Sequence, residues 1–164
     1  MTTNEQVKTI PDGYTTVTPW IITRDTNAQI EFMTKAFDAE EIFRVVGEDG
    51  TIGHAEARIG TSIVMMFDSR DHWIDTPAFL RLYLDDADAT FEKAINAGAT
   101  AVTRMTHAPW GERVGRILDP QGNLWWLHTR IENVDEAELA RRAEDPKFVE
   151  AMNYIQGSDI IPRR

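Results

Sequence analysis

A histidine and a glutamate stand two positions apart in the segment 53–59, and they are the strongest candidates for acid–base chemistry in the chain. If this segment is a β-strand, His54 and Glu56 point to the same face of its sheet. An imidazole beside a carboxylate suits general acid or base catalysis. We therefore assign His54 and Glu56 as candidate catalytic residues. The alternative is that both only hydrogen-bond to neighbouring strands or to Arg81.

The segments 79–84 and 124–130 alternate apolar side chains with aromatic and charged ones. The leucines of 79–84, and Trp125, suit a face buried against a helix. The opposite faces carry Phe79, Arg81, Tyr83, Trp126 and His128. Aromatic side chains together with charges indicate a partly wet cavity that binds a small molecule. The alternative is a solvated face crossed by salt bridges.

These segments belong to two copies of one unit. Asp25 and Asp86 each precede a helical pattern and lie 61 positions apart, while Gly60 and Gly122 each precede a strand pattern and lie 62 apart. Each copy is typical of a strand, a helix capped by an aspartate, and three further strands. The second helix is expected to stop at Gly98.

The repeat predicts an α+β fold with two paired modules and a tail. We expect a domain over residues 1–132, built from modules 14–68 and 78–131, and a helical C-terminal tail over 133–164. In the tail, Asn133 and Glu136 resemble a capping box, and Asp145-Pro146 is a typical start for a second helix.

Composition narrows the classes of function. The 164 residues carry a net charge of −10 and no cysteine. The missing cysteines exclude disulfides, thiolate metal sites and cysteine nucleophiles. The acidic balance disfavours nucleic-acid binding, and no apolar run is long enough for a membrane span. We expect a cytoplasmic protein.

Three motifs resemble the vicinal oxygen chelate superfamily, which contains glyoxalase I, bleomycin-resistance proteins and extradiol dioxygenases. They are Ile52-Gly53-His54-Ala55-Glu56, Trp110-Gly111-Glu112-Arg113 and Asp119-Pro120-Gln121-Gly122-Asn123-Leu124-Trp125, within about residues 14–132. The chain is most similar to the PhnB-like branch. The resemblance implies paired βαβββ modules that form a curved mixed sheet around a cavity, and a homodimer.

In metal-dependent members of that superfamily, ligands lie on the first and last strand of each module. The spacing of the repeat places these positions at Thr18, Val64, Phe79 and Trp126. None of these side chains suits a divalent metal, so we predict neither a metal nor another cofactor. The alternative is a non-standard site built from His54, Glu56 and His128 with water. The same spacing makes Arg116 the counterpart of His54.

Taken together, the sequence favours a protein that binds a small organic molecule without a catalytic metal. The predicted ligand-binding residues are Trp20, Phe79, Arg81, Tyr83, Trp110, Arg116, Trp126 and His128. The segment 105–111 is expected to be a lid, or else a packing or dimer contact. Alternatively, Trp126 fills the cavity, and the arginines, including Arg113, pair with Glu56, Asp68 or Glu112. Two other functions stay open: a glyoxalase-type lyase or isomerase that uses His54 and Glu56, and a non-catalytic structural or interaction module.

Overall fold

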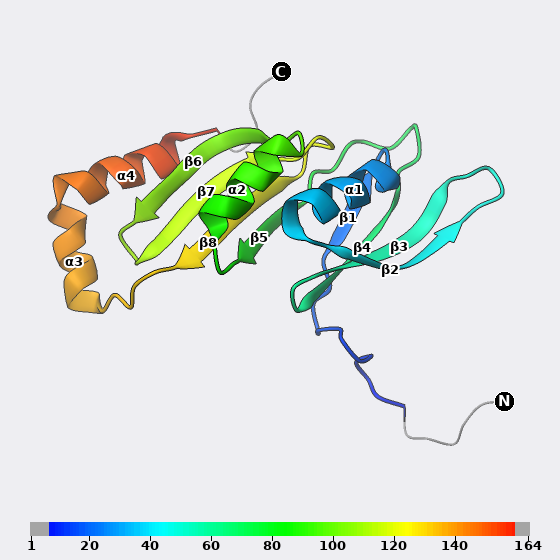
Figure 1. Ribbon diagram of the computed structural model, residues 1–164, viewed down its shortest axis with the longest axis horizontal. Helices are drawn as coiled ribbons and strands as arrows, with labels where there is room; N and C mark the ends of the chain where they lie inside the picture. The colour runs from blue at the N-terminus through cyan, green and yellow to red at the C-terminus, as the bar shows by residue number, and fades with distance from the viewer. Residues whose placement is uncertain (1–6, 160–164) are drawn as a thin grey trace.

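The computed structural model describes residues 7–159, and its elements follow the predicted repeat (Figure 1). The first module comprises β1 (Trp20–Thr23), α1 (Thr26–Phe37), β2 (Glu40–Val46), β3 (Ile52–Ile59) and β4 (Ser62–Asp68). The second comprises β5 (Phe79–Tyr83), α2 (Ala87–Asn96), β6 (Thr100–Ala108), β7 (Glu112–Leu118) and β8 (Leu124–Arg130). The tail forms α3 (Glu136–Glu144) and α4 (Pro146–Gly157). The predicted α+β class is confirmed.

Each module forms its own four-stranded mixed sheet, in the orders β1-β4-β3-β2 and β5-β8-β7-β6. In both sheets the first and last strands of the module pair in parallel. Trp20 pairs with Met65 in the first sheet, and Arg81 pairs with Trp126 in the second. The steps from Trp20 to Arg81 and from Met65 to Trp126 are both 61 residues, so one offset relates these strands.

Aspartates begin both module helices, as predicted. A carboxylate oxygen of Asp25 accepts a hydrogen bond from the backbone N–H of Ala28 at 2.9 Å, and Asp86 accepts one from Ala89 at the same distance. Each bond satisfies an N–H that has no partner within the helix. At the end of α2, Gly98 adopts a φ of +105°, a left-handed conformation that glycine tolerates at little cost. The predicted stop at Gly98 is therefore confirmed.

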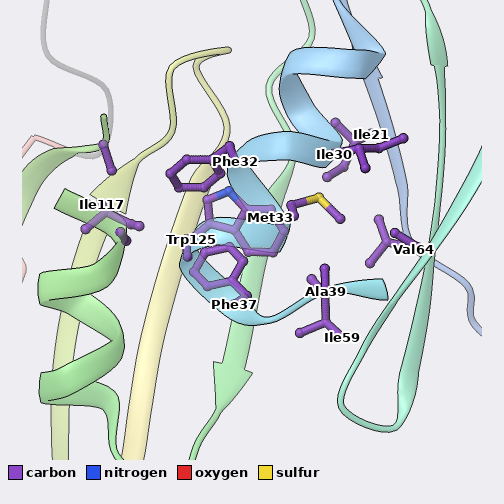
Figure 2. Packing of buried hydrophobic residues seen from close by; sticks show 14 of the residues in the cluster. Ile21, Ile30, Phe32, Met33, Phe37, Ala39, Ile59, Val64, Ile117 and Trp125 are labelled. Carbon is purple, nitrogen blue, oxygen red and sulfur yellow. The ribbon is translucent and has the colours of Figure 1, made fainter. Parts of the chain in front are cut away.

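The helices α1 and α2 lie side by side and share one hydrophobic core (Figure 1). Figure 2 shows Phe37 of α1 against the indole of Trp125, with ring centroids 4.7 Å apart. Trp125 is fully buried, as predicted for the helix-facing side of its strand. We call the opposite side of each sheet, turned away from α1 and α2, its outer face.

A buried carboxylate ties the turn before β8 to the first module. Asp119 accepts hydrogen bonds from Gln29 of α1 (2.8 Å), from the indole N–H of Trp125 (2.9 Å) and from the backbone N–H groups of Gln121 (3.0 Å) and Asn123 (2.8 Å). Hydrogen bonds to a charged acceptor are stronger than neutral ones. This aspartate therefore holds both the turn and the contact between modules.

The first helix of the tail is capped two residues later than predicted. The side chain of Asp135, not Asn133, caps α3, because its carboxylate reaches the free N–H of Glu138 at 2.8 Å. The helix α4 begins at Asp145-Pro146 as predicted. Within residues 7–159, no helix is long and apolar enough to cross a membrane.

Candidate functional site

The acid–base pair lies on the outer face of the first module. The Nε2 atom of His54 is 2.9 Å from a carboxylate oxygen of Glu56, and the hydroxyl of Tyr14 donates a hydrogen bond to the other oxygen. The Tyr14 hydrogen bond is the main cause that holds the pKa of Glu56 below its ordinary value; burial opposes it and His54 adds to it. Glu56 is therefore an ionised acceptor and a weak base. Nothing in the sequence around Tyr14 indicated this contact.

Aromatic side chains extend along this outer face from His54 to the linker between the modules, residues 69–77. The ring of Trp20 lies 6.3 Å from that of His54 and 5.2 Å from that of Phe67, and Trp73 lies 6.1 Å from Phe67. Trp20, Phe67 and Trp73 help to line a cavity of about 740 Å³. A second cavity, of about 550 Å³, is lined by Tyr14, Glu56 and Met65 among others. Both volumes are in the range of small-molecule sites.

The linker between the modules supplies Trp73, a residue to which the sequence assigned no role. The guanidinium of Arg24 bonds to Asp75 (2.6 Å) and to the backbone carbonyls of Arg70 (2.9 Å) and Trp73 (2.6 Å). These bonds fix the linker against the first module. Only the tertiary structure places Trp73 beside Phe67, because no motif surrounds it in the sequence.

On the outer face of the second module, two arginines flank one indole. The guanidinium carbon of Arg81 lies 4.5 Å from the ring centroid of Trp126, and that of Arg116 lies 5.3 Å from it. Arg116 and Trp126 are direct cross-strand partners. Guanidinium groups at these distances are attracted to the electron-rich face of an indole. The predicted ligand residues Arg81, Arg116 and Trp126 thus form one cluster.

A second histidine–carboxylate pair adjoins this cluster. The Nδ1 atom of His128 is 2.7 Å from Glu112, which also accepts a hydrogen bond from the indole N–H of Trp110 at 2.7 Å. Burial raises the pKa of Glu112, but the bonds from His128 and Trp110 outweigh it, so the net pKa is lowered. Burial also lowers the pKa of His128, with a further contribution from Arg81, against the opposing effect of Glu112. Neutral His128 then donates from Nδ1 and carries a lone pair on Nε2.

Three polar atoms of this face are buried without a hydrogen-bond partner: Nε of Arg116, Nε1 of Trp126 and Nε2 of His128. Buried polar atoms of a native protein nearly always have a partner. Arg116 is only 6% exposed, and its Nη2 donates to the carbonyl of Ile155 in α4. Burial lowers the pKa of Arg116, and among residues 7–159 the group that opposes this effect is Tyr154, not a carboxylate. The predicted pairing of Arg116 with Glu56, Asp68 or Glu112 is wrong.

The two outer faces do not meet within a single chain. Hydrogen bonds and ring contacts join His54 to Glu56 and Trp20, and Trp126 to His128 and Arg81, but among residues 7–159 none joins the first group to the second. Of five cavities formed by residues 7–159, none is lined by both groups and none is lined by Trp126. Trp126 is packed between other side chains, which agrees with the alternative prediction that Trp126 fills the cavity. Phe79 and Tyr83 lie exposed on the edge strand β5.

The strand registers correct two predicted correspondences. The counterpart of Trp126 is Met65, whereas Val64 faces the core. The counterpart of Arg116 is Glu56, because these residues pair with Trp126 and Met65 respectively. The glycine spacing gave the wrong correspondence because Trp126 follows its partner Arg116 by ten residues, whereas Met65 follows its partner Glu56 by nine.

The corrected positions still lack the donors of a divalent metal site. With Met65 in place of Val64, the ligand positions that the resemblance implies are Thr18, Met65, Phe79 and Trp126. None offers an imidazole or a carboxylate. Along the part of the chain that the structure describes, no three His, Asp or Glu side chains gather to hold a metal. The residues therefore do not fit the metal of the metal-dependent vicinal oxygen chelate proteins.

The predicted lid over residues 105–111 is wrong. Its first four residues belong to β6, which pairs with β7 up to the partners Ala108 and Glu112. A tight turn follows, in which the N–H of Gly111 donates to the carbonyl of Ala108 at 3.1 Å. Paired backbone groups hold this segment in the sheet. Arg113, the other predicted anion contact nearby, pairs with Asp88.

Comparisons with known proteins agree with this architecture. Residues 13–127 match the model of the Glyoxalase/Bleomycin resistance protein/Dioxygenase superfamily. An uncharacterized protein of Mycobacterium bovis is 36% identical over 141 residues, which cover 78% of this chain and 93% of that protein.

Solved structures show the same fold at lower identity. TioX from Micromonospora sp. ML1 has a TM-score of 0.59 at 24% identity, over 68% of this chain and 95% of that one. The fosfomycin resistance protein FosX of Listeria monocytogenes has a TM-score of 0.58 at 16% identity, over 75% and 95%. A PhnB protein from Bacillus cereus has a TM-score of 0.55 at 15% identity, over 70% and 99%. With two βαβββ modules and a family match over most of its length, the chain belongs to the glyoxalase/bleomycin resistance protein/dioxygenase superfamily.

Proposed function

We propose that this protein binds a small planar organic molecule on the outer face of its first module, without a catalytic metal. The observation that carries the proposal is the cavity of about 740 Å³ with Trp20, Phe67 and Trp73 in its walls. Aromatic walls favour a flat ligand through stacking. The neighbouring row of Tyr14, Glu56 and His54 adds hydrogen-bonding groups that select its orientation.

We further propose that two copies associate as a homodimer. The edge strand β2 exposes Ile42, Phe43, Val45 and Val46, and Phe79 and Tyr83 are exposed on the edge strand β5. An exposed apolar edge strand is a ready template for pairing with another chain. A dimer would cover these side chains and offer the outer face of one chain to that of its partner. On the basis of the three motifs, we also propose that this chain belongs to the PhnB-like branch of the superfamily.

A glyoxalase-type lyase or isomerase is the second candidate, favoured by the two histidine–carboxylate pairs. Glu56 is a poor proton acceptor because the hydrogen bond from Tyr14 lowers its pKa. We expect no turnover of the methylglyoxal–glutathione adduct, with or without added divalent metal. Robust turnover that His54→Gln abolishes would replace the binding proposal with the enzymatic one.

Native mass spectrometry of freshly purified protein tests the binding and dimer proposals together. We expect a dimer that carries a small organic adduct and no stoichiometric metal. Phe43→Glu is expected to shift the dimer to monomer, because it places a charge on the apolar edge. A monomeric, ligand-free wild type would overturn both proposals.

A thermal-shift screen of planar aromatic compounds then locates the site. Compounds that bind are expected to raise the melting temperature of the wild type but not of Trp73→Leu. Leu139→Ser is the matched control, because Leu139 is 42% exposed, close to the 38% of Trp73, and lies on α3. If the same compounds stabilise Trp73→Leu as much as the control, the ligand binds elsewhere.

A further inference from the structure

The C-terminal helix α4 covers part of the outer face of the second module. Ile155 of α4 is buried against Ala108 and Val114, and Trp110 and Trp126 pack against this small cluster. The hydroxyl of Tyr154 accepts a hydrogen bond from the backbone N–H of Arg104 in β6 at 2.8 Å. Figure 1 shows α4 running alongside β6, at the edge of the second sheet. The tail therefore occupies the face on which the predicted ligand residues lie.

The contact between Arg116 and the carbonyl of Ile155 places the end of a helix where an anion would bind. Ile155 lies in the last turn of α4, where carbonyl groups have no partner within the helix. The aligned peptide dipoles give this end of a helix a partial negative charge. A full anion would bind a buried guanidinium more strongly than this carbonyl does, and would also reach its unpartnered Nε.

The tail is also separable from the shared core of the family. The family model ends at residue 127, before α3 begins. The helix α4 contacts the sheet through one side-chain cluster, the ring of Phe148 against that of His107, the Tyr154 hydrogen bond and the Arg116 contact. A segment held by few contacts opens at a low free-energy cost.

We propose that α4 is a displaceable cover, whose C-terminal carbonyls stand in for the anionic oxygens of an organic carboxylate ligand at Arg116. This inference rests on the proposed function, because it assumes a small-molecule ligand, and it names the ligand class and the control of the second half of the site. When the carboxylate binds, its oxygens take the donors Nε and Nη2 of Arg116. Trp126 then offers its indole face and N–H to the ligand, and α4 leaves the sheet.

Hydrogen exchange of the full-length protein tests the cover, with benzoate as the probe and the uncharged benzamide as its matched control. We expect benzoate to accelerate amide exchange in residues 146–157 about fivefold or more, and benzamide to have no effect. Arg116→Met should abolish the response to benzoate. Tyr154→Phe, which removes one anchor of α4, should lower the benzoate concentration at half response about fivefold. Val149→Ser, an exposed position on the same helix, should leave it unchanged.

The outcomes separate this inference from the proposed function. If exchange in α4 does not respond to benzoate up to its solubility limit in either the wild type or Tyr154→Phe, the cover is refuted. The thermal-shift experiment with Trp73→Leu tests the proposed function separately, whatever the exchange in α4 shows. An equal response of α4 to benzoate and benzamide would also refute the proposed cover, because the charge of the ligand would then play no part. A response that survives in Arg116→Met would show that the anion binds at another residue.

Discussion

The outer faces of the two modules carry opposite chemistry on the same strand framework. Glu56 of the first module and Arg116 of the second occupy equivalent positions, so an anion in one half corresponds to a cation in the other. The first face is open, with two cavities, and α4 covers part of the second. The difference teaches that the repeat conserves the positions of strands and helices, while the outward side chains and the tail decide what each half binds.

The core-facing sides of the two modules bury side chains of different size at equivalent positions, and the free energy of unfolding should reflect this difference. Trp125 and Val64 occupy equivalent buried positions on β8 and β4. We expect Trp125→Ala to lower the free energy of unfolding by about 3–5 kcal/mol, because it leaves a large cavity against Phe37. Val64→Ala should cost about 1–3 kcal/mol, since less apolar surface is lost. Urea denaturation measures both, and equal losses would contradict a core centred on Trp125.

The turns before the last strands also differ, since only the second turn contains a buried carboxylate. Asp119→Asn keeps the shape of the side chain but weakens its charge-assisted hydrogen bonds, so we expect a loss of about 1.5–3 kcal/mol. Ser62→Ala, at the exposed start of β4, should change the free energy of unfolding by less than about 0.5 kcal/mol. A similar small effect of both substitutions in urea denaturation would refute the anchoring role of Asp119.

Glu56 and Glu112, the histidine-paired carboxylates of the two outer faces, each have one further donor that a single substitution removes. Trp110→Phe should cost about 1–2 kcal/mol, because Glu112 is buried and loses an indole N–H donor. Tyr14→Phe should cost less, since Tyr14 is only half-buried, but it should raise the pKa of Glu56 towards its ordinary value. NMR titration of the Glu56 carboxyl checks the second effect. An unchanged pKa would mean that the Tyr14 bond does not form in solution.

The smallest expected effect is the pH dependence that His128 contributes. Its pKa is lowered in the folded protein, so acidification protonates the unfolded state first and lowers stability as pH falls below about 6.5. Glu112 stays ionised at that pH because its own pKa is lowered below the ordinary carboxyl range. His128→Gln should therefore flatten the decline in stability between about pH 7.5 and about pH 5.5. His72→Gln, at an exposed linker position, should leave the decline unchanged.

Local sequence signals were enough for most of the fold. Aspartates before apolar helical patterns, and a glycine after one, identified both module helices because capping depends on residues only three or four apart. The alternation of Trp125 with Trp126 predicted which indole is buried in the core, since strand side chains alternate by geometry. The equivalence of Met65 and Trp126 was missed because the chain from Arg116 to Trp126 is one residue longer than that from Glu56 to Met65, and a one-residue shift turns a strand by a full face.

The sequence by itself determined the elements, the two modules, the family and the list of polar and aromatic residues on the outer faces. Only the tertiary structure decided which of these residues meet. It joined Arg116 to Ile155, 39 residues away, and Arg24 to the linker beside Trp73. It also kept His54 and His128 apart within one chain. The physical reason is that caps and strand alternation act over a few residues, whereas contacts between distant segments depend on how whole sheets and helices pack.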